Sequence, residues 1–493
     1  MTGLVGIVMN SACAEDLFYL TDYHSHLGTA RGGLATRRDD NSLNSKIHDL
    51  SRTQFKSQFH HDFPRMEGNL GIGAISDKDP QPLRMQGKFE SGTEKYSIVT
   101  SGRITNLDEL GDELGSLSNV RGDNSLNMTE VVAALIGEGN TIPEGIENMY
   151  NKIQGSCSLL MLTKDGIYAA RDSMGRTPLI IGNRKDFKGG DEWAVVSETC
   201  SFPNLDFKKK KELKPGEIVL LTERGITDIR PGKDKMQICS FLWVYTGDIT
   251  SEYEGISAQQ ARHNSGGLLA ERDFELDIDM VFGVPDSGLG HGHGYINRRN
   301  EMILEHIAYL HKNNPEDLGE FLENTSAIKW LQGAVKYTAG WARSYVPPTQ
   351  AERDMVAKMK LNPGDIEDKN VLINEDSIVR GTQLRALVDK LRKYGANEVH
   401  ARVSCPPLIS PCMYARSTKS KDELVAIRAI RDLEGKDPED IHPYLNHETK
   451  QYEAMVEWIR KDLHLTSLEY LHHNELSQAI GLPAEKLCME CWK

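Results

Sequence analysis

The chain has 493 residues, and 58 Lys and Arg against 72 Asp and Glu give it a net charge of −14 at neutral pH. Because proteins that coat nucleic acid need a basic face, this charge argues against that class. With 39% apolar and 26% charged residues, the composition is that of a globular protein rather than a disordered one. No stretch approaches the roughly 18 apolar residues of a membrane-spanning helix, and MTGLVGIVMN lacks the basic flank of a secretory signal. We therefore expect a cytoplasmic protein of two or three domains, with neither nucleic acid nor membrane as partner.

Short apolar runs bounded by Gly, Asn, Asp or Pro predict a β-rich domain from residue 3 to about residue 230. The runs are residues 4–9, 96–99, 158–162 and 218–221. Residues 107–114 and 129–135 have helical spacing, with Asn106 and Thr129 as the expected N-caps. The lysine run at 208–211 is typical of a solvated turn.

After Cys239 the pattern changes to alternating strands and helices. Strands are expected at residues 279–284 and 369–373, and helices at 257–271, 383–394, 300–344 and 422–465. Ligands bind where the strands of such sheets end. The first strand runs into the turn at 284–288 and the second into Glu375 and Asp376, so these segments are the predicted binding site.

The string VLINEDSIVRGTQ, residues 371–383, carries the strongest functional signal. A strand delivers two carboxylates, and the loop after it can turn backbone amides toward a phosphate at a helix N-terminus. The acids suit ribose hydroxyls or a hydrated Mg²⁺, and the amides suit a 5′-phosphate. A bare acidic pair would more often be a solvated strand end.

The whole string closely resembles the phosphoribosyl diphosphate (PRPP) signature of type I phosphoribosyltransferases, in the form found in glutamine PRPP amidotransferases. Five more strings resemble that family: VPDSG at 284–288, RSYVPPTQAERDMVAKMKL at 343–361, RDSMGRTPLIIG at 171–182, SETC at 197–200 and LKPGEIV at 213–219. The resemblance covers nearly the full chain. It implies an α/β and α+β protein: an Ntn-hydrolase-like αββα sandwich at 1–235, a transferase domain with a Rossmann-like parallel sheet at 236–420, and a helical C-terminal segment with a CxxC tail at 421–493.

The resemblance also implies a reaction, the displacement of pyrophosphate from C1 of PRPP by ammonia. Glu375 and Asp376 would hold the ribose diol and Mg²⁺, and Arg343 and Lys336 would stabilise the leaving pyrophosphate. The pyrophosphate turn would contribute Asp286, Ser287 and Gly288, and the 5′-phosphate loop Ser377, Arg380, Gly381 and Thr382. The chain departs from the family at Glu375, where Asp is usual, and at Gln383, where Thr is usual.

The family's glutamine-hydrolysing site has lost its main groups in this chain. Thr2 stands where the family has its N-terminal Cys nucleophile, and HRGQ has become His26-Leu27-Gly28-Thr29. The remaining replaced positions are Ser76 for the Arg that binds the glutamine carboxylate, Ser101-Gly102 for the oxyanion-hole Asn-Gly, and Met128 for the Asp that binds the α-amine. Each charge-assisted contact contributes roughly 1.5 to 3 kcal/mol, so we predict that glutamine is not hydrolysed.

Two other residues could replace the family's N-terminal Cys as the nucleophile. Removal of Met1 would make Thr2 an N-terminal nucleophile, a known variation on this chemistry. Cys13 lies nearby in sequence, but it has no α-amine and a free cysteine is more often buried in a core.

Four cysteines match the ligands of a [4Fe-4S] cluster in cluster-bearing members of the family: Cys239, Cys412, Cys488 and Cys491. Zinc is the alternative, because four thiolates suit it equally. Cys405 lies close to Cys412 in sequence, and Cys157 and Cys200 are expected in the core. The histidines of GHGHG, residues 290–294, are weak evidence for a metal.

The sequence thus favours a transferase that uses PRPP with free ammonia, or with an amine delivered by a partner protein. A non-catalytic relative that binds PRPP or a nucleotide and regulates a partner is the main alternative, and a transferase for another amine is a third. The resemblance also implies a homo-oligomer.

Overall fold

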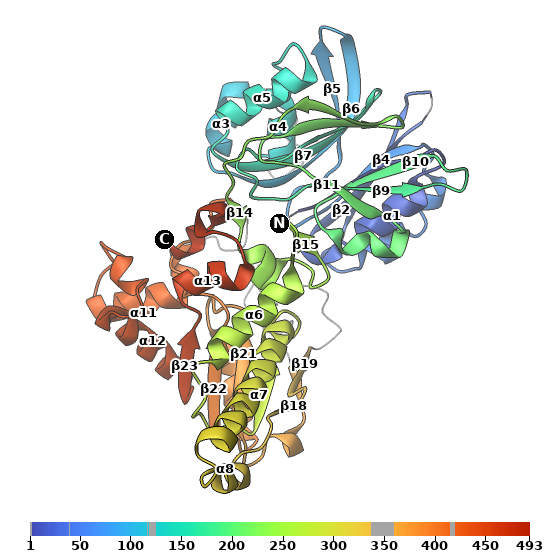
Figure 1. The fold of residues 1–493 in the computed structure, drawn as a ribbon. Helices are drawn as coiled ribbons and strands as arrows, with labels where there is room; N and C mark the ends of the chain where they lie inside the picture. Colours follow the sequence, from blue (N-terminus) through green and yellow to red (C-terminus); the bar gives the residue numbers. More distant parts are fainter. Residues whose placement is uncertain (1, 39, 116, 118–124, 337–358, 415–419) are drawn as a thin grey trace.

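The computed structural model describes residues 2–38, 40–115, 117, 125–336, 359–414 and 420–493. Two antiparallel sheets form the N-terminal half of the protein, and one parallel sheet forms the C-terminal half (Figure 1). No helix in these ranges is both long and apolar enough to cross a membrane.

The first sheet is seven-stranded and antiparallel, and α1 (Ala14–Asp22) packs on its outer face. Its strands in spatial order are β11 (Lys208–Glu212), β9 (Ile180–Lys185), β10 (Asp191–Val196), β1 (Gly3–Val8), β4 (Leu70–Ser76), β2 (Arg31–Arg37) and β3 (Leu43–Asp49). A short helix, α2 (Phe55–Phe59), follows β3.

The second sheet is six-stranded and antiparallel, and three helices cover its outer face. Its strands in spatial order are β13 (Gly225–Arg230), β12 (Ile218–Thr222), β8 (Gly166–Ala170), β7 (Gly155–Thr163), β6 (Gly92–Ile104) and β5 (Leu83–Phe89). The helices are α3 (Leu107–Leu114), α4 (Met128–Ile136) and α5 (Ile142–Lys152).

Alternation along β1 explains how the sheets pack, because successive strand residues point to opposite faces. Leu4 and Val8 lie in the core between the sheets with Leu160 of β7. Val5 packs outward against Leu17 of α1. The result is the αββα sandwich that was expected.

Two local predictions in this half are wrong. The N-cap of α4 is Asn127, whose side chain accepts a hydrogen bond from the backbone N–H of Thr129, so Thr129 is already inside the helix. The lysine run is not a turn but strand β11, in which Lys209 pairs with Glu212 and Glu252. These ion pairs allow an otherwise unfavourable run of like charges to form an edge strand.

The C-terminal half is built on a parallel sheet with helices on its faces. Its strands in spatial order are β18 (Lys329–Trp330), β17 (Met280–Gly283), β21 (Asn370–Glu375), β22 (Glu398–Val403) and β23 (Ser467–Tyr470). Helices α6 (Ala258–Ala270) and α7 (Gly288–Asn313) lie in front of the sheet in Figure 1, and α10 (Thr382–Lys393) packs against β22.

The GHGHG motif forms the first turns of α7, where its glycines allow close contact with α6. A Cβ atom at Gly294 would lie 2.0 Å from the carbonyl oxygen of His263. His291 is buried, and its ring nitrogens lie 2.6 Å from Ser265 Oγ and 3.0 Å from the Val244 carbonyl oxygen. Both ring nitrogens of His291 are therefore engaged within the protein.

The remaining elements extend the C-terminal half. They are β14 (Ile238–Cys239), β15 (Glu252–Tyr253), β16 (Ile256–Ser257), α8 (Leu318–Asn324), β19 (Ala334–Lys336), β20 (Met359–Leu361), α11 (Val425–Glu434), α12 (Lys450–Asp462), α13 (His473–Ile480) and β24 (Leu487–Cys488). The helical prediction for 300–344 is wrong at residues 325–336, because β18 and β19 follow α8, and its last part, 337–344, lies outside the described residues. The domain boundaries at residues 235 and 420 stay a prediction.

Candidate active site and the comparison with known proteins

The two predicted binding segments lie side by side at the carboxyl edge of the parallel sheet. Strands β17 and β21 are neighbours, with Gly283 in register with Asn374. Ser287 Oγ donates a hydrogen bond to Asp376 Oδ2 at 2.5 Å, and Ser377 Oγ donates to Asp376 Oδ1 at 2.6 Å. The structure therefore brings the turn at 284–288 into contact with the acidic pair.

Glu375 and Asp376 form a pair of crowded carboxylates. Glu375 Oε2 is buried and has no hydrogen-bond partner among the residues that the structure describes. Burial, and then the charge of Asp376, raise the pKa of Glu375 well above its usual value. A pair held this way favours a bound cation or hydroxyl donors, and Mg²⁺ commonly takes one or two carboxylates plus substrate phosphates. The pair fits such an ion, although the described residues contain no group of three His, Cys, Asp or Glu side chains arranged for a metal.

The loop after the acidic pair ends at the N-terminus of α10. Gly381 is the N-cap residue of this helix and has a φ of +78°, a conformation that favours glycine. Arg380 pairs with Glu423 through its guanidinium, and its carbonyl oxygen accepts a hydrogen bond of 2.8 Å from Arg428. Thr382 opens the helix, so the four predicted phosphate contacts lie on one short loop.

The other transferase residues are less fully described. Asp286 lies in the turn and is exposed to solvent, next to the buried Ser287 and Gly288. Lys336 is the last residue of β19. Arg343, with the rest of 337–358, lies outside the described residues.

Asn374 is a site residue that the sequence analysis did not single out. It is fully buried at the end of β21, and neither polar atom of its side chain has a hydrogen-bond partner among the described residues. Buried amides are almost always hydrogen-bonded, to protein or to water. The sequence does contain a signal for this residue, because a single Asn stands between the apolar residues of the strand and the acidic pair.

Several of the positions predicted to replace glutaminase residues lie near the start of β1. Thr2 precedes this strand, and its carbonyl oxygen accepts a hydrogen bond of 2.8 Å from Ser101 Oγ. Gly102 follows on β6, and Met128, the first residue of α4, is buried. Ser76 ends β4, where its Oγ accepts hydrogen bonds from the backbone N–H groups of Lys78 and Asp79 at 3.2 and 3.1 Å.

A buried hydrogen-bond network fills the space beside these positions. Gln81 Oε1 accepts from the Thr100 backbone N–H at 2.7 Å, and Gln81 Nε2 donates to the Thr100 carbonyl oxygen at 3.2 Å. Thr100 Oγ1 and Thr129 Oγ1 are 2.7 Å apart. Polar atoms that are already paired with one another are less available to a ligand.

Cys13 lies in the core under the first sheet and is fully buried. Burial raises the pKa of its thiol to about 12. Since the thiolate is the nucleophile, this environment does not favour Cys13 as a substitute for the missing catalytic cysteine.

Glu198 connects the two halves of the protein. Its carboxylate lies 2.7 Å from His26 Nε2 and accepts hydrogen bonds from the Tyr253 hydroxyl at 2.8 Å and the Asp248 backbone N–H at 3.2 Å. Burial alone would raise the pKa of Glu198, but the charge and hydrogen bond of His26, followed by His24 and Tyr253, lower it to about 2.

Four cysteine thiols lie near one another between the two halves. Cys239 of β14 is in parallel register with Cys488 of β24. A hydrogen bond with Cys412, burial, and the neighbouring thiols of Cys239 and Cys488 all raise the pKa of Cys491. The chemistry of this donor set fits a cluster or a zinc ion, although in the described part of the chain the four thiols do not have the geometry of a metal site.

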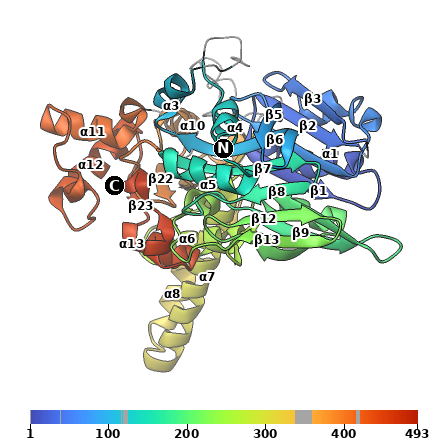
Figure 2. The same ribbon diagram turned by 90° about the horizontal axis from the view of Figure 1, so that it is seen from above.

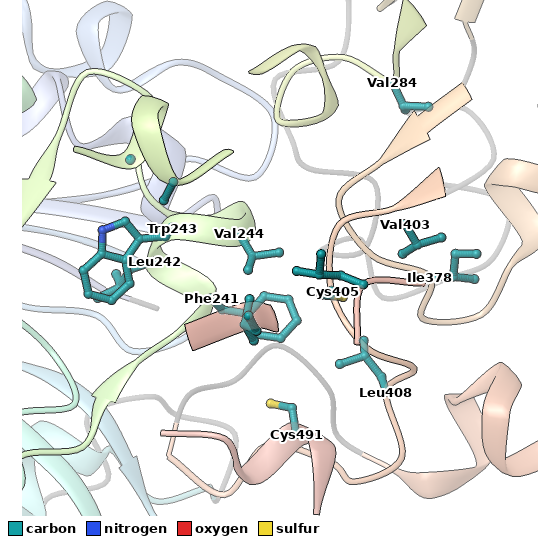
Figure 3. Packing of buried hydrophobic residues seen from close by; sticks show 14 of the residues in the cluster. Phe241, Leu242, Trp243, Val244, Val284, Ile378, Val403, Cys405, Leu408 and Cys491 are labelled. Carbon is teal, nitrogen blue, oxygen red and sulfur yellow. The ribbon is translucent and has the colours of Figure 1, made fainter. Parts of the chain in front are cut away.

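Cys405 is set apart from these four thiols. Burial, and then the charges of Asp376 and Glu375, raise its pKa, so its charged neighbours are the acidic pair. In Figure 3, Cys405 lies beside Val244, on the side away from Trp243, whereas Cys491 points toward Phe241. Although Cys405 and Cys412 are close in sequence, only Cys412 lies with the other three thiols.

Comparison with known proteins gives consistent results. A family described as "Glutamine amidotransferase domain" matches residues 70–203. The amidophosphoribosyltransferase of Bacillus subtilis is 31% identical over 394 residues, which cover 74% of this chain and 76% of that protein. The chain belongs to the amidophosphoribosyltransferase family. The enzyme of Methanothermobacter thermautotrophicus is 27% identical over 507 residues, or 99% of this chain and 93% of the relative.

Among solved structures, glutamine PRPP amidotransferase from Bacillus subtilis aligns with a TM-score of 0.76 and 24% identity, covering 100% of this chain and 96% of the other. This likeness confirms the predicted fold class. Both relatives are amidophosphoribosyltransferases, which are glycosyltransferase-type enzymes.

Proposed function

We propose that this amidophosphoribosyltransferase displaces pyrophosphate from PRPP with ammonia or another amine and does not use glutamine. Ser76 carries the proposal. At the position that would hold the glutamine carboxylate, a buried hydroxyl accepts two hydrogen bonds from its own turn, next to Asp77 and Asp79 instead of a guanidinium. Residue 76 itself would therefore offer a carboxylate ligand a hydroxyl that is already hydrogen-bonded, and no positive charge.

Two further observations support the loss of glutaminase chemistry. Met128 is buried where the family would bind the α-amine, so residues 76 and 128 offer a zwitterion neither of the charged contacts expected at those two positions. The network around Gln81 and Thr100 is internally paired. The N-terminal domain would then serve assembly or would seal the transferase site.

On the transferase side, Glu375 and Asp376 would hold the ribose diol and Mg²⁺. The loop with Ser377, Arg380, Gly381 and Thr382 would bind the 5′-phosphate, and Asp286, Ser287 and Gly288 would lie beside the pyrophosphate. Arg343 and Lys336 would neutralise the leaving group. The protein would act mainly by positioning the reactants and by electrostatic stabilisation, and Mg²⁺ would neutralise pyrophosphate charge when bound.

The amine would arrive as free ammonia or through a partner protein. A [4Fe-4S] cluster, with zinc as the alternative, would be held by Cys239, Cys412, Cys488 and Cys491 and would fix the C-terminal tail. A cytoplasmic location is the accompanying expectation, although some relatives are chloroplastic.

A second candidate is a non-catalytic protein that binds PRPP or a nucleotide and regulates a partner. Gln383 favours it, because a longer amide side chain replaces the usual Thr in the first turn of α10, next to the phosphate loop.

One assay separates these functions. With PRPP, Mg²⁺ and ammonium, pyrophosphate should be released, and replacing ammonium by glutamine should abolish the release. Release at a similar rate with glutamine would contradict the proposal. If calorimetry shows that PRPP binds but no amine causes pyrophosphate to be released, the second candidate is favoured. An Asp376→Asn variant gives the background level for both the binding and the release measurement.

A further inference from the structure

The side chain of Asn374 lies on the side of the parallel sheet where α6 and α7 run side by side, as both views show (Figures 1 and 2). Asn374 is in register with Arg402 of β22, and residues in register on neighbouring parallel strands point to the same face. The Arg402 guanidinium donates hydrogen bonds of 2.6 and 2.7 Å to Asp273, which also accepts one of 2.7 Å from Tyr295 of α7. Arg402, and with it Asn374, therefore points toward α7.

Asp376 is on the same face as Asn374, because side chains two residues apart along a strand point the same way. Its hydrogen bond with Ser287, the residue before α7, agrees with this placement. Asn374 also touches the start of α7, since a Cβ atom at Gly288 would lie 2.7 Å from the Asn374 carbonyl oxygen. The Cα atoms of residues two apart in a strand are separated by about 6.6 Å, which an amide and a carboxylate side chain can bridge.

The amide of Asn374 is unpaired within the described part of the chain. Both of its polar atoms are buried, and neither has a hydrogen-bond partner there. Ser404, two residues after Arg402 on the same face, likewise has a buried Oγ without a partner among the described residues. An unpaired buried amide is unfavourable compared with an apolar side chain of similar shape. Such a residue beside a ligand-binding acid is explained if its hydrogen bond forms in another state of the site.

The proposed reaction supplies such a state. Asp376 Oδ2 accepts its hydrogen bond from Ser287, and Ser287 belongs to the turn that we propose lies beside the pyrophosphate. A hydroxyl has one proton to donate, so a Ser287 that donates to a pyrophosphate oxygen no longer donates to Asp376. The carboxylate then needs another donor to keep the orientation in which it would hold the ribose.

We propose that Asn374 is a positioning residue that takes over this hydrogen bond. When Ser287 turns to the pyrophosphate, the Nδ2 group of Asn374 turns toward Asp376 and donates to the oxygen that Ser287 has left. The inference rests on the proposed function for the identity of the ligand. The exchange of donors is a property of the protein itself, so it can also be tested without that ligand.

Urea unfolding of the free protein tests the exchange through a change of sign. In the wild-type background, Asn374→Leu removes an unpaired amide and keeps a side chain of similar size, so the urea midpoint should rise. In a Ser287→Ala background, Asp376 has lost its present donor and Asn374 should already supply the replacement. Asn374→Leu should then lower the urea midpoint, because it removes a hydrogen bond to a charged group.

Thr36→Val is the matched control for unfolding. Thr36 is fully buried in β2, and its Oγ1 has no hydrogen-bond partner among the residues that the structure describes. Since β2 belongs to the N-terminal half, Thr36→Val should change the urea midpoint equally with and without Ser287→Ala. An effect of Asn374→Leu that has the same sign in both backgrounds would overturn the proposal.

Calorimetry with PRPP and Mg²⁺ is the second test, and it needs only the single variant. Asn374→Leu should weaken binding at least about tenfold, whereas Thr36→Val should bind as tightly as wild type. Wild-type affinity in Asn374→Leu would overturn the proposal. If the wild type itself binds no PRPP, the proposed function fails, and the sign of the urea effect alone decides whether Asn374 replaces Ser287 as the donor.

Discussion

Ser287 donates a hydrogen bond to Asp376 across 89 residues of sequence. This contact joins the turn after β17 to the acidic end of β21, so the proposed pyrophosphate and ribose contacts belong to one hydrogen-bonded unit. Both side chains are buried, which fixes the carboxylate orientation before a ligand arrives.

The first prediction concerns this unit. Asp376→Asn should lower kcat/KM for pyrophosphate release by about 10² to 10³, the usual effect of removing one preorganised electrostatic group. Magnesium-dependent binding of PRPP, measured by calorimetry, should weaken in parallel. Asp389→Asn, on the exposed side of α10, should change neither measurement; equal losses in both variants would show that Asp376 has no special role.

A pH dependence of stability is expected from His291. Burial lowers the pKa of this imidazole to about 3 from a usual 6.5, so the folded state resists protonation. Below pH 6.5 the imidazole is protonated in the unfolded chain but stays neutral in the folded one, which favours unfolding. The free energy of unfolding is therefore unaffected by this group above pH 6.5 and decreases as the pH falls from 6.5 toward 3. Between pH 7 and pH 5 the loss is about 2 kcal/mol.

Urea unfolding of wild type and His291→Asn at pH 7 and pH 5 measures this loss. The variant should be less stable at pH 7, and its stability should change less between the two pH values. His311→Asn, on the exposed end of the same helix, should keep the wild-type pH dependence. The same pH dependence in all three proteins would contradict the assignment to His291.

The close packing of α6 and α7 predicts a cost for adding one methyl group. Gly294→Ala would place Cβ 2.0 Å from a backbone oxygen, which only a shift of the helices can relieve, so we expect a loss of about 1 to 3 kcal/mol in the free energy of unfolding. Gly319→Ala is the control, because nothing lies within 4 Å of its added Cβ. That change should be neutral or slightly stabilising.

The four neighbouring thiols predict bound metal in the purified protein. Anaerobic preparation should give iron, sulfide and a broad visible absorption band, whereas zinc without sulfide would favour the alternative. Cys412→Ser and Cys488→Ser should each lose most of the metal, while Cys405→Ser, altered next to the acidic pair, should keep it. Retention of full metal content by Cys412→Ser would rule out this ligand set.

Sequence patterns predicted the elements well where local signals agreed with tertiary packing. The helix at Leu107–Leu114 has helical periodicity, and the strand that runs into the acidic pair is a continuous apolar run with polar residues at both ends. Strand β11 was missed because four lysines predict a turn, and only the carboxylates from distant segments make a strand possible. Asn127 was missed as a cap because Thr129 has an equally good local signal.

Most residues of the candidate site were predicted from the resemblance to a family, and fewer from the chemistry of the local sequence. The acidic pair and the phosphate loop had a local rationale, but the contact of Ser287 with Asp376 depends on the order of strands in the sheet. The contacts by which Glu198 joins the two halves could not be predicted. Its partners His26, Asp248 and Tyr253 lie far from it in sequence.

The parallel pairing of β14 with β24 has a consequence for biosynthesis. Residues 238–239, just after the first two sheets, pair with residues 487–488, and Trp492 stacks on Phe241 with ring centroids 5.2 Å apart. A ribosome delivers the chain from its N-terminal end, and domains generally fold in that order. The nascent sandwich can therefore form early, but the connection that follows it acquires its partner strand only after about 250 further residues, up to residue 488, have been made.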